Sequence, residues 1–237
     1  MELALGAPMN ASTTIAERVQ RLREEVAEIA RSANRNPAEI AIVAVSKLQP
    51  RQFVFEAYAA GIRAFGENHV QEAIPKFAGL SHSAERHYIG HVQTNKAKRM
   101  VAEFDLVQSV DRLEAGLALA KAARERETPT RVLLQLNISA AERYGLQPEL
   151  APEIAERLRA EGLEVAGTMA IGPLTDDPTT IRDAFLRAAE AHQRVGGQIL
   201  SLGMSADWPI AVACGSTMIR VGTAIFGPRP RKGGTPA

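Results

Sequence analysis

Eight short apolar runs, each followed by a stretch with helical periodicity, restrict the fold of this chain more than any other feature. Alternation of strand and helix favours a parallel sheet, because parallel neighbours need a long crossover between them. Eight such units within about 200 residues fit a single-domain α/β protein, a (β/α)8 TIM barrel, with a doubly wound open sheet as the alternative. The predicted strands are residues 40–45, 62–66, 87–90, 106–110, 132–138, 163–171, 199–203 and 218–222. The predicted helices between them are residues 51–60, 69–77, 95–104, 112–126, 148–160, 179–195 and 209–214.

An extra helix is predicted before the first strand. Residues 14–17, TIAE, fit a capping box, in which the Thr14 hydroxyl and the Glu17 carboxylate bind free backbone N–H groups at the helix start. The apolar residues that then share one helical face are Ile15, Val19, Leu22, Val26 and Ile29. No linker divides the rest of the chain. We therefore expect one barrel domain over residues 13–228, with flexible segments at 1–12 and 229–237.

Composition narrows the classes of partner and compartment. The 237 residues carry a formal net charge of +1, which argues against a broad surface for nucleic acid or membranes. Cys214 is the one cysteine, so no intrachain disulfide forms, as is typical of a reducing compartment. The sequence shows neither a secretory signal nor an apolar run of the ~20 residues that a membrane span needs. We expect a cytoplasmic protein that is a monomer, with a dimer as the alternative.

A lysine stands at the end of the first predicted strand, in IAIVAVSKLQP (residues 40–50). Lys47 shares strand parity with Val43 and Val45, so if these point into the barrel, Lys47 points into its mouth. Active sites of such barrels lie at this end of the strands. Two interpretations stay open: the lysine extends into solvent, or it is held in the mouth, where a buried neutral amine is the usual Schiff-base nucleophile.

Residues after the seventh and eighth predicted strands suggest an anion site at the same end of the barrel. Ser205 follows the seventh strand, and Gly222 and Thr223 end the eighth, which is where such barrels often bind phosphate. Arg220 lies inside the last strand, and a buried guanidinium requires a partner. That partner is either a structural carboxylate or a ligand. Asn68, at the end of the second strand, either touches a ligand or caps the next helix.

Two histidines, His87 and His91, have the four-residue spacing of a helical metal pair. The segment is predicted to be a strand, where residues four apart lie ~13 Å apart, and no Glu or Cys accompanies the pair in the motif. The sequence therefore predicts no metal site here.

Several segments resemble the pyridoxal phosphate homeostasis proteins, also called PLP-binding proteins. They are AIVAVSK, FGENHVQEA, HYIGHVQTNK, LVQSVD, GTMAIGP and LSLGMSADWPIAVACGSTMIRVGTAIFG, and they lie within residues 15–227. The resemblance implies a barrel similar to the N-terminal domain of alanine racemase. It further implies that pyridoxal 5′-phosphate (PLP) is the cofactor, held as a Schiff base on Lys47.

The same resemblance assigns contacts to the other candidate residues. Ser205, Gly222 and Thr223 would hold the phosphate of PLP, Arg220 would approach the pyridine nitrogen, and Asn68 would line the pocket. Three segments depart from the family pattern: LQP after the lysine where TKP is more usual, MAIGP in place of MTIGP, and a loop ISAAERYGLQP that is less rich in Lys and Ser. These departures affect contacts at the rim and leave the lysine in place.

The function implied by the resemblance is that of a carrier and regulator of intracellular PLP, without strong catalysis, with PLP-dependent apoenzymes as candidate recipients. An arginine at the pyridine nitrogen favours the unprotonated ring, which is a weak electron sink. We also expect the second domain that supplies an acid–base partner in racemases to be missing. The alternatives are a PLP-dependent enzyme, such as a small amino-acid racemase, and a Schiff-base aldolase without cofactor.

Overall fold

The computed structural model describes residues 13–126, 129–139 and 143–228. The segments predicted to be flexible, 1–12 and 229–237, lie outside the described residues. Within the described ranges, no helix combines the length and the apolarity needed to cross a membrane.

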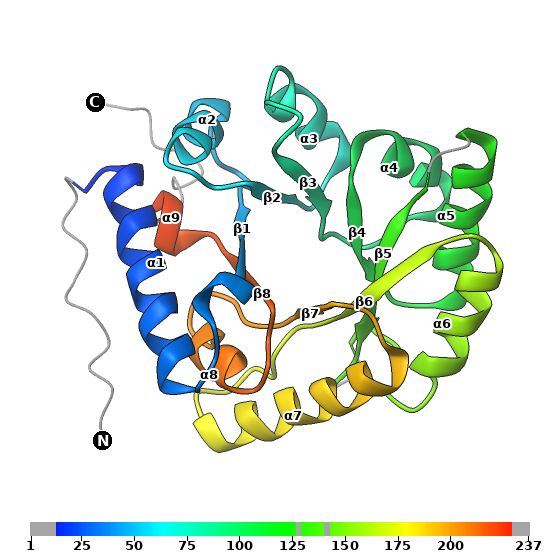
Figure 1. The fold of residues 1–237 in the computed structure, drawn as a ribbon. Helices are drawn as coiled ribbons and strands as arrows, with labels where there is room; N and C mark the ends of the chain where they lie inside the picture. Colours follow the sequence, from blue (N-terminus) through cyan, green and yellow to red (C-terminus); the bar gives the residue numbers. More distant parts are fainter. Residues whose placement is uncertain (1–12, 127–128, 140–142, 229–237) are drawn as a thin grey trace.

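Eight parallel strands form a closed barrel in which each strand pairs with its sequence neighbours and β8 pairs with β1 (Figure 1). The prediction of a (β/α)8 barrel is therefore confirmed, and the open sheet is excluded. The strands are β1 (Ala41–Val45), β2 (Ala64–Glu67), β3 (Glu85–Tyr88), β4 (Leu106–Val110), β5 (Arg131–Leu136), β6 (Glu164–Ala170), β7 (Ile199–Ser201) and β8 (Met218–Val221).

Helices surround the ring of strands on its outer side (Figure 1). They are α1 (Ile15–Ser32), α2 (Arg51–Ala59), α3 (Val70–Phe77), α4 (Ala97–Glu103), α5 (Leu113–Arg126), α6 (Ala151–Ala160), α7 (Pro178–Val195), α8 (Trp208–Ala213) and α9 (Thr223–Phe226), with 3-10 turns η1 (Pro37–Glu39) and η2 (Thr94–Lys96). The extra N-terminal helix is confirmed, because the predicted capping box is present at Thr14 and Glu17. Its buried face packs against α2, α8 and α9.

Of the eight predicted strands, the third differs most in position from the observed one. Residues 87–90 were predicted, whereas β3 begins and ends two residues earlier, at Glu85–Tyr88. The polar start of β3 hid it from a search for apolar runs. Gly90 lies beyond the strand, where a side-chain carbon at this position would lie 2.1 Å from the backbone oxygen of Asn68. Two strand-end loops therefore approach each other closely here, which only glycine permits.

The two faces of the strands have different surroundings. The outward residues join the main core between barrel and helices, while a smaller apolar cluster fills the barrel interior. Its members are Val43, Ala64, Leu106, Leu133, Ala166, Met169 and Met218. Because the side chains of a strand alternate, Val43 in the interior cluster fixes which residues of β1 face inward. The interior alanines are small, and buried polar side chains also face the interior of the barrel.

Candidate functional site

Lys47 lies in a tight turn directly after β1. The Gln49 N–H donates to the Ser46 carbonyl oxygen at 3.0 Å, which closes a four-residue turn with Lys47 in its second position. Leu48 occupies the third position with φ of 62°, a left-handed conformation that costs a leucine about 1–2 kcal/mol. Val43 faces the interior and the Ser46 hydroxyl contacts Glu67 on the helix-facing side, so the direction expected for Lys47 by alternation is towards the barrel mouth.

An ionic network lies behind this turn, on the helix-facing side of the barrel. The Ser46 hydroxyl donates to Glu67 Oε1 at 2.7 Å, and Lys76 Nζ donates to the same oxygen at 2.6 Å. Lys76 also donates to the Ser46 carbonyl oxygen at 2.8 Å and to Glu72 Oε1 at 2.7 Å. We call Ser46, Glu67, Glu72 and Lys76 the outer polar network. Burial raises the pKa of Glu67, although the hydrogen bonds from Lys76 and Ser46 act in the opposite direction.

Lys76 and Glu72 were not among the residues predicted to contribute to the site. In QEAIPKF they have the ordinary spacing of a helical ion pair, which is usually a solvated surface feature. Lys76 is instead 6% exposed. The signal in the sequence was that Lys76 lies among the buried positions Ala73 and Phe77 of α3, where a lone lysine requires a carboxylate partner.

Asn68 follows the last residue of β2 and lies beside the Lys47 turn. Val45 pairs with Gly66 in the sheet, so Lys47 and Asn68 are each two residues beyond a paired position. Asn68 Oδ1 is buried and has no hydrogen-bond partner within the described part of the chain. The α3 N-cap is His69, which makes no side-chain cap bond, so the capping role considered for Asn68 is not observed. A buried acceptor of this kind is one that a ligand can satisfy.

The predicted phosphate residues all lie at the carboxyl ends of β7 and β8. Ser205 is exposed in the turn between β7 and α8. Gly222 is the N-cap of α9, and Thr223 is its first residue. A Cβ on Gly222 would lie 3.2 Å from the Val45 carbonyl oxygen, so this position is immediately beside the end of β1. The structure thus brings Gly222 and Thr223 to the strand that carries Lys47.

Arg220 is buried inside the barrel, where β8 pairs with β1 at Val43. Its Nη1 donates to the carbonyl and hydroxyl oxygens of Ser201 at 2.8 and 2.7 Å, and its Nη2 donates to the Ala170 carbonyl oxygen at 2.8 Å. Burial lowers the pKa of Arg220 to about 10, while the charge of Asp207 acts to raise it. The guanidinium therefore remains a cation at neutral pH, and these three hydrogen bonds go to neutral oxygens of β6 and β7.

A chain of hydrogen bonds continues from Arg220 through the barrel interior to its opposite end. The Ser201 hydroxyl donates to Gln108 Oε1 at 2.8 Å, and Gln108 Nε2 lies 2.9 Å from His87 Nδ1. His87 Nε2 lies 3.0 Å from Glu85 Oε2. We call Ser201, Gln108, His87 and Glu85 the inner polar chain. His87 holds the pKa of Glu85 at about 2, well below its usual value.

The two histidines considered for metal binding have separate partners. His87 belongs to the inner polar chain, whereas His91 Nδ1 lies 3.1 Å from Asp111 Oδ2. Among residues 13–126, 129–139 and 143–228, no cluster of three metal-binding side chains is found. The two histidines therefore make separate structural contacts, and their four-residue spacing does not mark a shared site.

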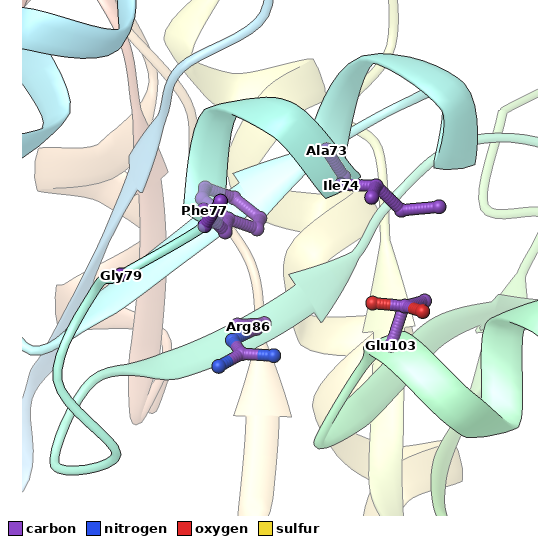
Figure 2. Close-up of a pocket in the computed structure, with 7 residues that line it drawn as sticks. Ala73, Ile74, Phe77, Gly79, Arg86 and Glu103 are labelled. Carbon is purple, nitrogen blue, oxygen red and sulfur yellow. The ribbon is translucent and has the colours of Figure 1, made fainter.

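Two surface clefts lie away from the barrel mouth. A cleft of about 230 Å³ lies between α3 and α4; Figure 2 shows Phe77 and Ile74 of α3 on one side and Arg86 of β3 and Glu103 of α4 on the other. A second cleft, of about 630 Å³, lies between α1 and the amino-terminal ends of β1 and β2. Neither is lined by any of the candidate residues, so the mouth remains the site that the chemistry defines.

Comparison with known proteins supports this assignment of the fold. Residues 18–230 match the family model of the alanine racemase N-terminal domain. A pyridoxal phosphate homeostasis protein from Pseudomonas aeruginosa is 39% identical over 222 residues, which cover 92% of this chain and 96% of the relative. The structure of PipY from Synechococcus elongatus with PLP bound is 36% identical, covers 90% of this chain and 100% of its own, and has a TM-score of 0.78. An alanine racemase from Clostridium difficile shares the fold at 15% identity, with a TM-score of 0.71, and is covered over 57% of its length.

The closed barrel and the match over residues 18–230 define a protein of the alanine racemase N-terminal class. The 39% identity to the Pseudomonas relative extends over nearly the full length of both chains and identifies one family within this class. The chain belongs to the family of pyridoxal phosphate homeostasis proteins, as its sequence motifs predicted.

Proposed function

We propose that this protein binds PLP at the barrel mouth, with Lys47 as the covalent attachment point, and acts as a cytoplasmic carrier of the cofactor for PLP-dependent apoenzymes. The proposal is supported by the positions of a lysine, a buried arginine and a glycine-capped helix start, which lie on or directly after two adjacent strands. Lys47 follows β1, while Arg220, Gly222 and Thr223 belong to or follow β8, the strand hydrogen-bonded to β1.

The residues at the mouth fit the chemical groups of PLP. The cofactor needs an amine for its aldehyde, donors for its phosphate and a partner for its ring nitrogen. Lys47 supplies the amine. Gly222 and Thr223 supply backbone N–H groups at the start of α9, which have no intrahelical partners, together with a hydroxyl. Ser205 adds a second hydroxyl from the adjacent loop. Asn68 Oδ1, which has no hydrogen-bond partner among the described residues, is a buried acceptor on the β2 side of the mouth.

When bound, PLP supplies an electron sink whose strength depends on the protonation of its ring nitrogen. Arg220 keeps its proton at neutral pH, because its pKa of about 10 is well above 7. It would therefore donate a hydrogen bond to the ring nitrogen and keep its own proton. Residues that hold the cofactor firmly while leaving its sink weak suit a carrier better than a catalyst.

The proposal is tested by visible absorption of the purified protein after addition of PLP. We expect a band near ~420 nm, characteristic of an imine, in the wild type and its loss in Lys47→Ala. Lys98→Ala is the matched control, because Lys98 is a well-exposed lysine of α4 paired with Glu125 on the surface. A band that survives in Lys47→Ala, or a wild type that stays colourless with PLP, would overturn the proposal.

A racemase is the alternative function, favoured by the fold that this chain shares with the Clostridium difficile alanine racemase. Interconversion of D- and L-amino acids by the PLP-loaded protein separates the two. The carrier proposal predicts negligible turnover, and turnover at rates typical of enzymes, ~1–10³ s⁻¹, would replace it with the racemase.

A further inference from the structure

The turn that carries Lys47 is held in an unfavourable backbone conformation. Leu48, the residue after the lysine, has φ of 62° and a side chain that is 55% exposed, so its own packing contributes little to holding this conformation. Left-handed geometry at a branched residue persists only where other contacts enforce it. The conformation of the turn therefore depends on interactions that Ser46 and Leu48 make with other elements.

Those interactions come from α3. The Leu48 N–H donates to Glu72 Oε1 at 2.9 Å, and this oxygen also accepts from Lys76 Nζ. Lys76 in turn binds the Ser46 carbonyl oxygen. The residues on both sides of Lys47 are thus tied to one buried ammonium, Ser46 directly and Leu48 through Glu72.

Glu72 is more than the exposed partner of a helical ion pair. Its side chain is 28% exposed, and its hydrogen bond to Leu48 joins residues 24 apart in the sequence. Partial burial acts to raise the pKa of Glu72, but the hydrogen bonds from Lys76 and from the Leu48 N–H hold it below its usual value. The carboxylate is therefore ionised at neutral pH and available to the turn.

We propose, on the basis of the function proposed above, that Glu72 is a positioning residue for Lys47. Glu72, oriented by Lys76, accepts the Leu48 N–H and so holds the turn that directs the lysine into the barrel mouth. Loss of this acceptor frees the turn to relax from its left-handed conformation, and the amine is then presented in the binding geometry for a smaller fraction of the time.

The experiment compares Glu72→Ala with Glu72→Gln and with a matched control. Gln keeps an oxygen acceptor for the Leu48 N–H and removes the charge, whereas Ala removes both. Glu125→Ala is the control, because it deletes an ion pair of the same 2.7 Å length, with Lys98, on an exposed surface of α4 and α5. Two quantities are measured: hydrogen exchange of the Leu48 amide in the protein without PLP, and the dissociation constant of PLP from titration of the ~420 nm band.

In Glu72→Ala we expect exchange of the Leu48 amide to accelerate by about three- to tenfold, and PLP to bind about three- to tenfold more weakly, as the net contribution of one hydrogen bond predicts. In Glu72→Gln the exchange rate and the dissociation constant of PLP should both lie close to the wild-type values, and in Glu125→Ala neither should change. Wild-type binding by Glu72→Ala overturns the inference. Equal weakening by Ala and Gln also overturns it, since a general effect of charge would then be responsible.

The readouts distinguish failure of this inference from failure of the proposed function. If Lys47→Ala keeps the band, the function itself is wrong and the inference falls with it, whatever the amide exchange shows. If Lys47→Ala loses the band while Glu72→Ala binds PLP normally, the function stands and the positioning role is wrong.

Discussion

Replacing Gln108 by leucine cuts the inner polar chain at its centre and tests whether the chain stabilises the barrel. Gln108 is fully buried, accepts from the Ser201 hydroxyl and lies 2.9 Å from His87 Nδ1. Leucine has a similar length and no polar atom. The substitution therefore leaves Ser201 and His87 each short of one partner inside the barrel.

The expected cost follows from these two lost hydrogen bonds. Each buried group left without its partner costs about 1–2 kcal/mol. Burying leucine in place of an amide returns about 1 kcal/mol. The free energy of unfolding of Gln108→Leu should therefore fall by about 1–3 kcal/mol. At about 2–4 °C per kcal/mol for a chain of this size, the melting temperature should fall by roughly 2–12 °C.

Urea unfolding measures this change, and an unchanged m-value shows that the same surface is exposed on unfolding. Gln52→Leu is the matched control, because Gln52 makes its hydrogen bond to Glu56 on the exposed surface of α2, and it should change stability by less than about 0.5 kcal/mol. A double-mutant cycle of Gln108→Leu with Ser201→Ala should show coupling of about 1 kcal/mol. Additive effects, or a Gln108→Leu protein as stable as the wild type, would refute the reasoning.

Two further substitutions test other contacts of the barrel. Gly90→Ala places a carbon 2.1 Å from the Asn68 carbonyl oxygen, which must then move by about 1 Å; we expect a loss of about 2–3 kcal/mol in urea unfolding, and a loss below about 1 kcal/mol would contradict the close approach. Because the His87 hydrogen bond lowers the pKa of Glu85 from 4.5 to about 2, its ionised form adds stability above pH 4.5 that is lost as the pH falls towards 2. The side chain is half exposed, so the effect is about 1 kcal/mol after screening; the stability difference between wild type and Glu85→Gln should shrink across this range, and a constant difference would exclude the linkage.

The sequence predicted the barrel because each of its signals is local. Strand and helix periodicity, the capping box at Thr14 and the polar residues after strand ends all follow from near neighbours in the chain. The candidate residues Lys47, Arg220 and Gly222 were found for the same reason: each lies at or near the carboxyl end of a predicted strand, where barrels place their sites.

The supporting contacts could not be predicted in this way, because they depend on register between strands. Gln108 and Ser201 are 93 residues apart and meet because both face the interior of the same barrel. Strand parity alone places Gln108 inward with Leu106, but its partner is determined by the stagger of several strands. The sequence likewise predicts Lys76 to be a surface residue, because only the packing of α3 on β2 places it beside the buried Glu67.

The outer polar network and the inner polar chain lie on opposite faces of the strands. Ser46 and Lys47 are adjacent in sequence; Ser46 contacts the outer polar network, and alternation from the interior residue Val43 predicts that Lys47 points towards the mouth. Arg220 is held separately, from the inner side, by the inner polar chain. The turn that carries Lys47 and the Arg220 guanidinium are therefore held by different sets of contacts, joined through the pairing of β1 with β8. The Glu72 variants therefore test the first set of contacts through PLP binding, whereas Gln108→Leu tests the second set through the stability of the barrel.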